Sequence, residues 1–418
     1  MKIIRLLLVG LCLGSSSVAS PATELFKEAS FYLSFNYHGY SSVKPEELAQ
    51  GLAVQLEQSC KPQGEACAFS AAYPFIERLA QGMRDGHTYY LSPSTYRTTL
   101  AQFSGINPNP SPLYGISFGN VNSRGEIAVL DVVAASPAFK AGLRPFDRIV
   151  AANSQKVSKL PDLRTILNTN EPVKLEVLRG DSSRPVRFEA VLQRARLEKN
   201  NLPFLYQPPN APAGVLALRI PTFVGSNDIA PKVHELVAQA QAQNANSLIL
   251  DLRNNGGGEE TECYGASSAF IGRAVNINET RLAKVNVGFD GGVFIGNDPR
   301  DLTRFEIAQP SLWKGKLSVL VNAGTASCGE LTAYLIQYNQ RGIVIGESTY
   351  GVLDTATEFW QLADQSALAI TYVRTLNPDG TRVPERVTPN ILARDDSSAA
   401  FETGRDPLFE RAYSNLAK

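Results

Sequence analysis

The chain has 418 residues, of which 44% are hydrophobic and 19% charged, and its 40 basic residues balance its 40 acidic residues. This length allows two or three domains with their own cores, and the balanced charge gives no indication of nucleic-acid binding or disorder. Beyond the N-terminus, no apolar run reaches the roughly 20 residues of a membrane-spanning helix.

Residues 1–22 have the pattern of a secretory signal peptide. Lys2 and Arg5 form a basic start, residues 6–13 form an apolar core, and small residues up to Ala22 offer cleavage sites. We therefore expect an exported protein, periplasmic or extracellular, with no integral membrane segment once the signal is removed.

Four cysteines remain after this segment. Because an exported protein folds in an oxidising compartment, we expect a disulfide between Cys60 and Cys67, which closes a short loop. Cys263 and Cys328 are either bridged or merely packed, and the sequence leaves both interpretations open. No Cys-x-x-Cys or His-x-x-x-His pair is present, so no metal site is predicted, and no cofactor is expected.

Residues 23–108 are predicted to form a helical N-terminal domain. The apolar positions of residues 46–58 and 73–83 have helical spacing, and Gly86 ends the second helix before an extended segment at 88–91.

His87 is the histidine that we select as functional. It lies between an acidic residue and a hydroxyl at the boundary of two elements, where a side chain can point into a cleft. His38, in an aromatic run, and His234, on a predicted helix, are expected to be structural.

Residues 109–197 are predicted to form a compact β-rich domain after a proline-containing linker. Its motifs are Ser-Pro-Ala from Ser136, Ala-Gly-Leu from Ala141, Asp-Arg-Ile from Asp147, and then Asn153. This succession strongly resembles a PDZ domain. The resemblance implies that an extended peptide adds to a sheet edge while loop amides hold its terminal carboxylate. The matching loop consists of Leu113, Tyr114, Gly115 and Ile116. The alternative is a PDZ fold that only packs against its neighbour.

Residues 198–418 are predicted to form an α/β domain with a partly parallel sheet. Strands are expected at 214–220, 247–253, 317–321 and 342–347, with helices after the first three. In such sheets the functional loops lie at the carboxyl ends of the strands.

Three glycines, Gly256 to Gly258, follow Asp251-Leu252-Arg253-Asn254-Asn255. Neither a dinucleotide-binding motif nor a P-loop is present, so nucleotide binding is not favoured. We interpret the run as a close backbone approach, with free N–H groups directed at an anion that forms during reaction.

Ser327 follows the strand at 317–321 and begins a predicted helix. This strand-turn-helix junction is a suitable place for a nucleophilic serine, because the helix N-terminus favours negative charge nearby. The alternative is a helix cap, in which Ser327 and Glu330 form a capping box.

These motifs together resemble the S41 family of serine peptidases, which includes the C-terminal processing peptidases and the tricorn-like enzymes. The motifs are Asp-Leu-Arg-Asn-Asn-Gly-Gly-Gly from Asp251 and Asn-Ala-Gly-Thr-Ala-Ser up to Ser327, with the PDZ-like region upstream. The resemblance implies an α/β catalytic domain of the ClpP/crotonase-like type with Ser327 as nucleophile. It also implies an oxyanion hole made by the backbone amides of Gly256 or Gly257 and of Cys328.

One position departs from the C-terminal processing peptidases, which use a lysine base about 25 residues after the serine. The matching stretch here is Ser348-Thr349-Tyr350-Gly351-Val352-Leu353-Asp354, and no lysine occurs between Leu317 and Ala417. Valine cannot accept a proton, so a Ser/Lys dyad is excluded.

The tricorn-like enzymes instead pair the serine with a histidine and a downstream glutamate. By resemblance, these residues are His87 and Glu385, which lies 58 positions after Ser327. An imidazole can take the serine proton, and a carboxylate orients it. Asp85 is the rival orienting group. The alternative for Glu385 is a surface salt bridge with Arg386 or Arg382.

We therefore predict an exported serine endopeptidase that acts on unfolded or tail-exposed polypeptides and captures C-termini through its PDZ-like domain. The alternatives are a catalytically inactive S41-like protein that binds a peptide or another ligand, and an esterase with the same machinery. Substrate preference and oligomeric state stay open.

Overall fold

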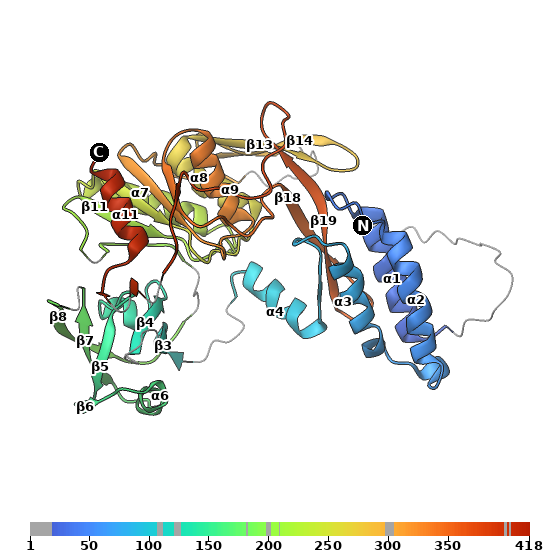
Figure 1. Ribbon diagram of the computed structural model, residues 1–418, viewed down its shortest axis with the longest axis horizontal. Coiled ribbons are helices and arrows are strands. Elements are labelled where there is room, and N and C mark those ends of the chain that lie inside the picture. Colours follow the sequence, from blue (N-terminus) through green and yellow to red (C-terminus); the bar gives the residue numbers. More distant parts are fainter. Residues whose placement is uncertain are drawn as a thin grey trace. The chain divides into compact units, whose positions relative to one another are not determined.

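The computed structural model describes residues 19–106, 112–120, 127–180, 183–197, 202–208, 210–296, 305–396, 399–400 and 403–418. Most of the predicted signal peptide lies outside these residues. The chain forms two compact units, Met1–Ser94 with Glu358–Ile370, and Thr95–Thr357 with Thr371–Lys418 (Figure 1). None of the helices in the described ranges has the length and apolarity that a membrane span requires.

The first unit is mainly helical, as predicted. Its helices are α1 (Pro21–Asn36), α2 (Pro45–Cys60) and α3 (Tyr73–Gly82), with short 3₁₀ turns η1 (Gly64–Ala66) and η2 (Phe69–Ala71). Ser20 caps α1, and Ala22 is fully buried, so the helical domain begins before the predicted boundary at residue 23. The predicted Cys60–Cys67 disulfide is present.

The first unit also contains Glu358–Ile370, which the sequence had assigned to the last domain. The reason is strand pairing: β1 (Tyr89–Leu91) pairs antiparallel with the start of β19 (Ala367–Leu376). Leu362 and Leu368 are buried in the same core as the helices. This packing joins residues that are far apart in the chain, so local sequence patterns do not reveal it.

The second unit begins at Thr95, within α4 (Pro93–Phe103), and contains an antiparallel sheet of the strand order β3-β4-β5-β7-β8, with β6 paired to β5. The strands are β3 (Ile116–Asn120), β4 (Ile127–Val132), β5 (Arg148–Ala152), β6 (Gln155–Lys156), β7 (Val173–Arg179) and β8 (Val186–Leu192). The short strands β2 (Pro112–Leu113) and β9 (Ala195–Arg196) pair with each other. Two helices complete this β-rich domain, α5 (Pro137–Lys140) and α6 (Leu160–Leu167). Because β3 is at the end of this order, it is an edge strand.

The second unit also contains the predicted α/β sheet, with the order β10-β11-β12-β16-β17-β20. Its strands are β10 (Phe204–Tyr206), β11 (Val215–Arg219), β12 (Ser247–Asp251), β16 (Lys316–Val321), β17 (Ile343–Gly346) and β20 (Ile391–Leu392). The pairs from β11 to β20 are parallel, and β10 is antiparallel. All five residues of β12 are buried, as expected for a strand covered on both faces.

The helices of this part are α7 (Ile229–Ala242), α8 (Glu260–Ile271), α9 (Cys328–Tyr338) and α11 (Pro407–Leu416). The remaining strands are β13 (Arg273–Glu279), β14 (Lys284–Asp290) and β15 (Val293–Gly296), together with β18 (Thr355–Gln361), most of which belongs to the first unit. β12 and β16 are parallel neighbours, with Asp251 opposite Leu320. The glycine run and the turn before Ser327 therefore leave the sheet side by side.

Candidate active site

The turn between β16 and α9 places Ser327 at the strand-turn-helix junction that the sequence predicted. Asn322 and Thr325 close the turn, with hydrogen bonds from Asn322 N–H to Thr325 Oγ1 (3.1 Å) and from Thr325 N–H to the Asn322 carbonyl (2.9 Å). Thr325 Oγ1 also donates to the Leu252 carbonyl at 2.9 Å. The turn at residues 322–327, which we call the nucleophile turn after the predicted role of Ser327, is thus attached to the end of β12.

Ser327 has a backbone conformation that L-residues rarely adopt, with φ 52° and ψ −121°. Such a conformation costs of order 1–3 kcal/mol and persists only where the surroundings impose it. A strained serine on a sharp strand-to-helix turn is the arrangement that exposes a nucleophilic hydroxyl. The capping-box alternative is also present, because Ser327 N–H donates to Glu330 Oε2 at 2.9 Å.

Glu330 has a larger role than a cap. Its buried carboxylate accepts hydrogen bonds from four donors, which are Ser327 N–H (2.9 Å), the Thr349 hydroxyl (2.5 Å), Gly351 N–H (2.8 Å) and Val352 N–H (3.0 Å). Burial raises the pKa of Glu330, although these hydrogen bonds act in the opposite direction. One carboxylate therefore joins the nucleophile turn to the segment 349–352, a role that the capping pattern alone did not reveal.

Substituting Glu330→Gln should destabilise the protein by about 2–3 kcal/mol, because the amide group cannot accept all the hydrogen bonds that the carboxylate accepts. We also expect kcat to fall about 10-fold or more as the turn loosens. Denaturant unfolding and steady-state kinetics measure both effects. Glu235→Gln on α7 is the control, because Glu235 is 63% exposed in its pair with Lys232. Equal stability of E330Q and the wild type would contradict the assigned role.

The glycine run approaches Ser327 closely, as predicted. Gly257 has φ +98°, and a Cβ placed there would lie 2.7 Å from Ser327 Cβ and 3.1 Å from Ser327 Oγ. A larger residue at this position would therefore clash with the serine. The Gly257 carbonyl accepts hydrogen bonds from Phe223 N–H (2.8 Å) and from the Thr222 hydroxyl (3.0 Å), which hold the loop on its other side.

The three candidate oxyanion donors, the N–H groups of Gly256, Gly257 and Cys328, differ in whether they already have a hydrogen-bond acceptor. Gly257 N–H already donates to Asn255 Oδ1 at 2.9 Å. Within the described ranges, the backbone N–H groups of Gly256 and Cys328 have no hydrogen-bond acceptor. Cys328 N–H is the first of helix α9, so it lies at the positive end of the helix dipole. Gly256 and Cys328 are thus the donors open to a ligand.

Asn255 connects the two loops, and motif analysis did not select it. Its carbonyl accepts Ala326 N–H at 2.9 Å, and its side-chain amide donates to the Ile220 carbonyl at 2.9 Å. The side chain is fully buried. A second link runs from Asn254 N–H to Asn322 Oδ1 at 2.9 Å. The two loops are therefore joined by one backbone hydrogen bond, from Ala326 to Asn255, and by the side-chain amide of Asn322.

Arg253 lies in a buried ionic cluster beneath the loops. Its guanidinium pairs with Asp251 (2.8 Å), Asp395 (3.2 Å) and Asp406 (2.7 Å). Burial alone would raise the pKa of Asp251, but the charges of Arg253 and Arg219 outweigh it and lower the pKa to about 2. Asp395 also accepts from Asn322 at 2.8 Å, so the cluster supports the nucleophile turn.

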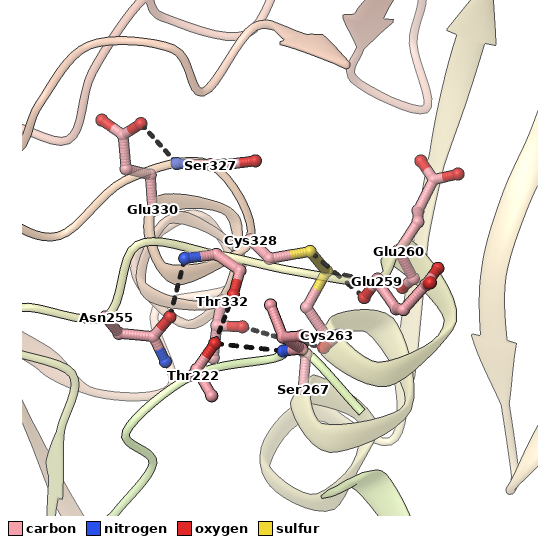
Figure 2. The surroundings of a disulfide bond; sticks show 12 residues. Thr222, Asn255, Glu259, Glu260, Cys263, Ser267, Ser327, Cys328, Glu330 and Thr332 are labelled. Carbon is pink, nitrogen blue, oxygen red and sulfur yellow. Dashed lines mark hydrogen bonds between the residues drawn. A yellow bond between two sulfur atoms is a disulfide. The ribbon is translucent and has the colours of Figure 1, made fainter. Parts of the chain in front are cut away.

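Cys263 and Cys328 are bridged, which decides between the two interpretations that the sequence left open. Figure 2 shows this bond between α8 and α9, next to Ser327. Both sulfur-bearing residues are buried, with Cys263 0% and Cys328 6% exposed. In the described ranges, no three His, Cys, Asp or Glu side chains are grouped so that they could hold a metal ion.

His87 belongs to the first compact unit, in which it is buried. Asp85 organises the turn before it, because Oδ1 accepts the backbone N–H of His87 (2.9 Å) and Oδ2 accepts the Tyr37 hydroxyl (2.8 Å). Burial and the Asp85 charge raise the pKa of Tyr37. His234 is structural, as expected: Nδ1 accepts Ser311 N–H at 2.8 Å, and burial lowers the pKa of the imidazole.

Glu385 makes the surface salt bridge that the sequence offered as its alternative role. Its carboxylate is 2.8 Å from Arg386, and its side chain is 59% exposed. Arg382 pairs with Asp354 instead. The Glu385 carbonyl accepts Leu353 N–H at 3.0 Å, so its segment runs beside the one that carries Val352.

The segment Leu113–Ile116 runs from the end of β2 to the first residue of the edge strand β3. Tyr114 is buried and donates its hydroxyl to the Leu167 carbonyl at 3.1 Å, while Leu113 is 45% exposed. Gly115 has φ +68° and accepts Val133 N–H at 2.9 Å. A cavity of about 440 Å³ adjoins this loop and is lined by Tyr114, Arg164, Thr165, Leu167, Asn168 and Arg194.

Comparison with known proteins identifies the two main domains. The sequence model of peptidase family S41 matches residues 214–393, and that of the PDZ domain matches residues 112–189. Residues 214–393 therefore form a peptidase family S41 domain. The family resemblance and the PDZ resemblance inferred from the motifs are therefore confirmed.

The chain is similar to proteases that are named for processing carboxyl termini. It is 26% identical over 314 residues to a carboxyl-terminal-processing protease of Synechocystis sp., covering 73% of this chain and 67% of the relative. It is 25% identical over 339 residues to the carboxy-terminal processing protease of Bacillus subtilis, covering 76% and 63%. A tail-specific protease of Haemophilus influenzae is 28% identical over 282 residues, or 64% of this chain and 36% of the relative. The chain thus spans only part of these relatives.

The fold is also similar to that of a solved putative S41 protease from Bacteroides fragilis. The TM-score is 0.55 at 16% identity, covering 80% of this chain and 87% of the other. At this identity, the likeness concerns the fold of the S41 chain and not its chemistry.

By the motif resemblance, Val352 matches the position where the C-terminal processing peptidases carry their lysine. Its side chain is buried, and its N–H donates to Glu330, which also accepts Ser327 N–H. The segment that matches the lysine motif is therefore attached to the nucleophile turn of this S41 domain, but it brings no titratable side chain at that position.

Proposed function

We propose that this S41 chain is an exported serine endopeptidase that cleaves peptide bonds in unfolded or tail-exposed proteins, with Ser327 as its nucleophile. The observation that carries the proposal is the strained backbone of Ser327, held against Gly257 at the start of a helix. A cap alone does not require this conformation. Two disulfides support export to an oxidising compartment.

The reaction begins when Ser327 Oγ attacks the peptide carbonyl and its proton passes to a base. Gly256 N–H and Cys328 N–H donate to the oxyanion of the tetrahedral intermediate. Collapse of this intermediate releases the amine product, which takes up the proton, and leaves an acyl-enzyme. A water molecule activated by the same base hydrolyses the acyl-enzyme and regenerates Ser327.

His87 is the proposed base, and Glu385 or Asp85 is the proposed orienting carboxylate. The absence of a lysine at Val352 supports a base from elsewhere in the chain, because serine needs a proton acceptor near neutral pH. A carboxylate that accepts the second imidazole N–H fixes the tautomer and stabilises the imidazolium.

Labelling with a fluorophosphonate tests the function directly, because this reagent modifies activated serines. We expect one equivalent of label on Ser327, and no label on Ser327→Ala. A protein that only binds peptides would not react. Relative rates on matched ester and peptide substrates separate a peptidase from an esterase.

Variants of the proposed triad test the base. His87→Ala should lower kcat by about 10³-fold or more. Replacing the orienting carboxylate by the matching amide, Asn or Gln, should lower kcat by about 10²- to 10⁴-fold. Asp85→Asn and Glu385→Gln are therefore compared, with Arg386→Gln as the control for loss of the salt bridge alone. Full activity of H87A would exclude His87 as the base.

We further propose that the PDZ domain captures C-terminal tails. Among the strands that the structure describes, β3 has a neighbour on one side only, so its other side can pair with an added strand, and the adjoining loop can receive a carboxylate. Arg164 lines the cavity near this loop, and no residue in the described ranges pairs with its guanidinium. Its positive charge suits a terminal carboxylate.

Arg164→Glu should weaken binding of a peptide with a free C-terminus by about 5- to 10-fold, because it places a negative charge at the cavity. Fluorescence anisotropy measures the affinity. An amidated peptide should show little change, and Arg187→Glu on β8, at the other edge of the sheet, is the control variant. An equal loss for both peptides would contradict carboxylate recognition.

A further inference from the structure

The disulfide between Cys263 and Cys328 joins the two loops of the site through their helices. Cys328 directly follows Ser327 and is the first residue of α9. Cys263 lies in the first turn of α8, which begins at Glu260 just after the glycine run. The two Cα atoms are 5.5 Å apart. One covalent bond therefore connects the starts of both helices (Figure 2).

The same two helices are in contact one turn further along. Ser267 Oγ and Thr332 Oγ1, each four residues after a bridged cysteine, are 3.3 Å apart and hydrogen-bonded. The bridge and this hydrogen bond lie on matching faces of α8 and α9, because residues four apart share a helix face. The helices consequently run side by side in a defined register.

The start of α8 is itself anchored to the segment 222–224. Glu259 N–H donates to the Phe223 carbonyl at 2.9 Å, and a Cβ on Gly258 would lie 2.0 Å from the Phe223 carbonyl carbon. The backbones of Gly258 and Phe223 are therefore in direct contact, so the start of α8, which carries Cys263, is held in place. The disulfide transmits this restraint to Cys328, the first residue of α9.

The first turn of α9 contains a residue with high backbone freedom next to Cys328. Its second residue is Gly329, and glycine is a poor helix former because it retains more backbone freedom than other residues. Cys328 N lies 3.0 Å from the position that a Cβ on Gly257 would take. A small shift of α9 would therefore change the spacing between Cys328 N–H and the glycine run.

We propose that the Cys263–Cys328 disulfide is a positioning element of the oxyanion hole, which holds Cys328 N–H at a fixed place relative to the glycine run. This inference rests on the proposed peptidase function. A positioning role requires that the disulfide stays oxidised. Both cysteines are buried, which protects the bond, because a reductant must reach a sulfur atom to open it.

The test compares the wild type with Cys263→Ala/Cys328→Ala, a variant that removes the bridge but keeps the backbone N–H groups. Cys60→Ala/Cys67→Ala is the matched control, because it removes an equally buried disulfide that belongs to the first unit. We expect kcat of the first variant to fall about 10- to 100-fold with KM within about twofold. The control should keep the wild-type kcat at temperatures where it is folded.

A peptide aldehyde provides a readout that a merely structural role would not change. Its hemiacetal with Ser327 places an oxygen in the oxyanion hole, so its inhibition constant should rise by the same factor as kcat/KM falls. Circular dichroism verifies that each variant is folded. If the alanine pair does not fold, Cys263→Val/Cys328→Ala refills part of the lost volume and is compared in the same way.

The outcomes separate this inference from the proposed function. A wild type that does not react with fluorophosphonate at Ser327 overturns the proposed function. A reactive wild type together with a folded bridge variant of unchanged kcat and aldehyde affinity overturns the inference alone. An equal loss of kcat in the folded Cys60/Cys67 control also overturns it, because the effect would then be general.

Discussion

Ser327→Ala is expected to lower kcat by about 10⁴-fold or more, because removal of the nucleophile leaves only binding and oxyanion stabilisation. Ser327→Gly should be equally inactive, but more stable than the wild type by about 1 kcal/mol. The reason is that φ 52° with ψ −121° is strained for serine and easily adopted by glycine. Hydrolysis of an unfolded protein and denaturant unfolding provide the two measurements.

If Ser327 acted only as a helix cap, Ser327→Gly would be less stable than the wild type and not more stable. Replacing a capping serine by glycine lowers stability by a few tenths of a kcal/mol. Ala326→Gly is the control, because Ala326 lacks a positive φ, and glycine there should destabilise by about 0.5–1 kcal/mol. Stability of Ser327→Gly below the wild type, with activity retained in Ser327→Ala, would support the cap and contradict the nucleophile.

Arg253→Leu is expected to destabilise the protein by about 3–5 kcal/mol. It removes the guanidinium that pairs with Asp406 and leaves Asp251 with only the longer pair to Arg219 (3.4 Å), and an unpaired buried charge is far more costly than a lost surface pair. Urea unfolding at neutral pH measures the difference. The control is Arg273→Leu, because the side chains of Arg273 and Asp290 are 61% and 51% exposed. That variant should change stability by less than about 1 kcal/mol.

The loss of stability caused by Arg253→Leu should become smaller as the pH falls. In the wild type, the pKa of Asp251 is lowered to about 2, so its contribution to stability is present above its unfolded value near 4 and is lost between about pH 4 and 2. Without Arg253, only Arg219 opposes the effect of burial on Asp251, so the pKa of Asp251 rises, the carboxylate protonates at higher pH and the variant recovers stability on acidification. A difference that stays constant from pH 7 to pH 3 would contradict this account.

The strand-loop-helix units of the S41 domain were predictable because their evidence is local. β12 and β16 are short apolar runs, and the glycines and Ser327 follow them directly. The PDZ domain was recognisable for a similar reason, since its motifs fall in one segment. The Cys60–Cys67 disulfide was also predictable, because its two cysteines are separated by only 7 positions.

The roles of Glu330 and Asn255 were not predictable in the same way. Glu330 bonds to Thr349, which is 19 positions away, and Asn255 accepts a hydrogen bond from Ala326 in another loop. A side chain's partner across such a distance depends on how the strands are ordered in the sheet. Local spacing indicated the capping box of Glu330 but gave no indication of its other donors.

The sequence by itself determined the family, the β-rich and α/β domains, the place of Ser327 and the absence of a lysine base, because each follows from residue types at short spacing. Tertiary structure alone decided that Cys263 bonds to Cys328 across 65 positions, and that Glu358–Ile370 belongs to the first unit. It also decided that Gly257 N–H is already occupied while Cys328 N–H is open. These features depend on which backbone segments meet in the folded chain, and that is set by strand pairing and helix packing rather than by any local pattern.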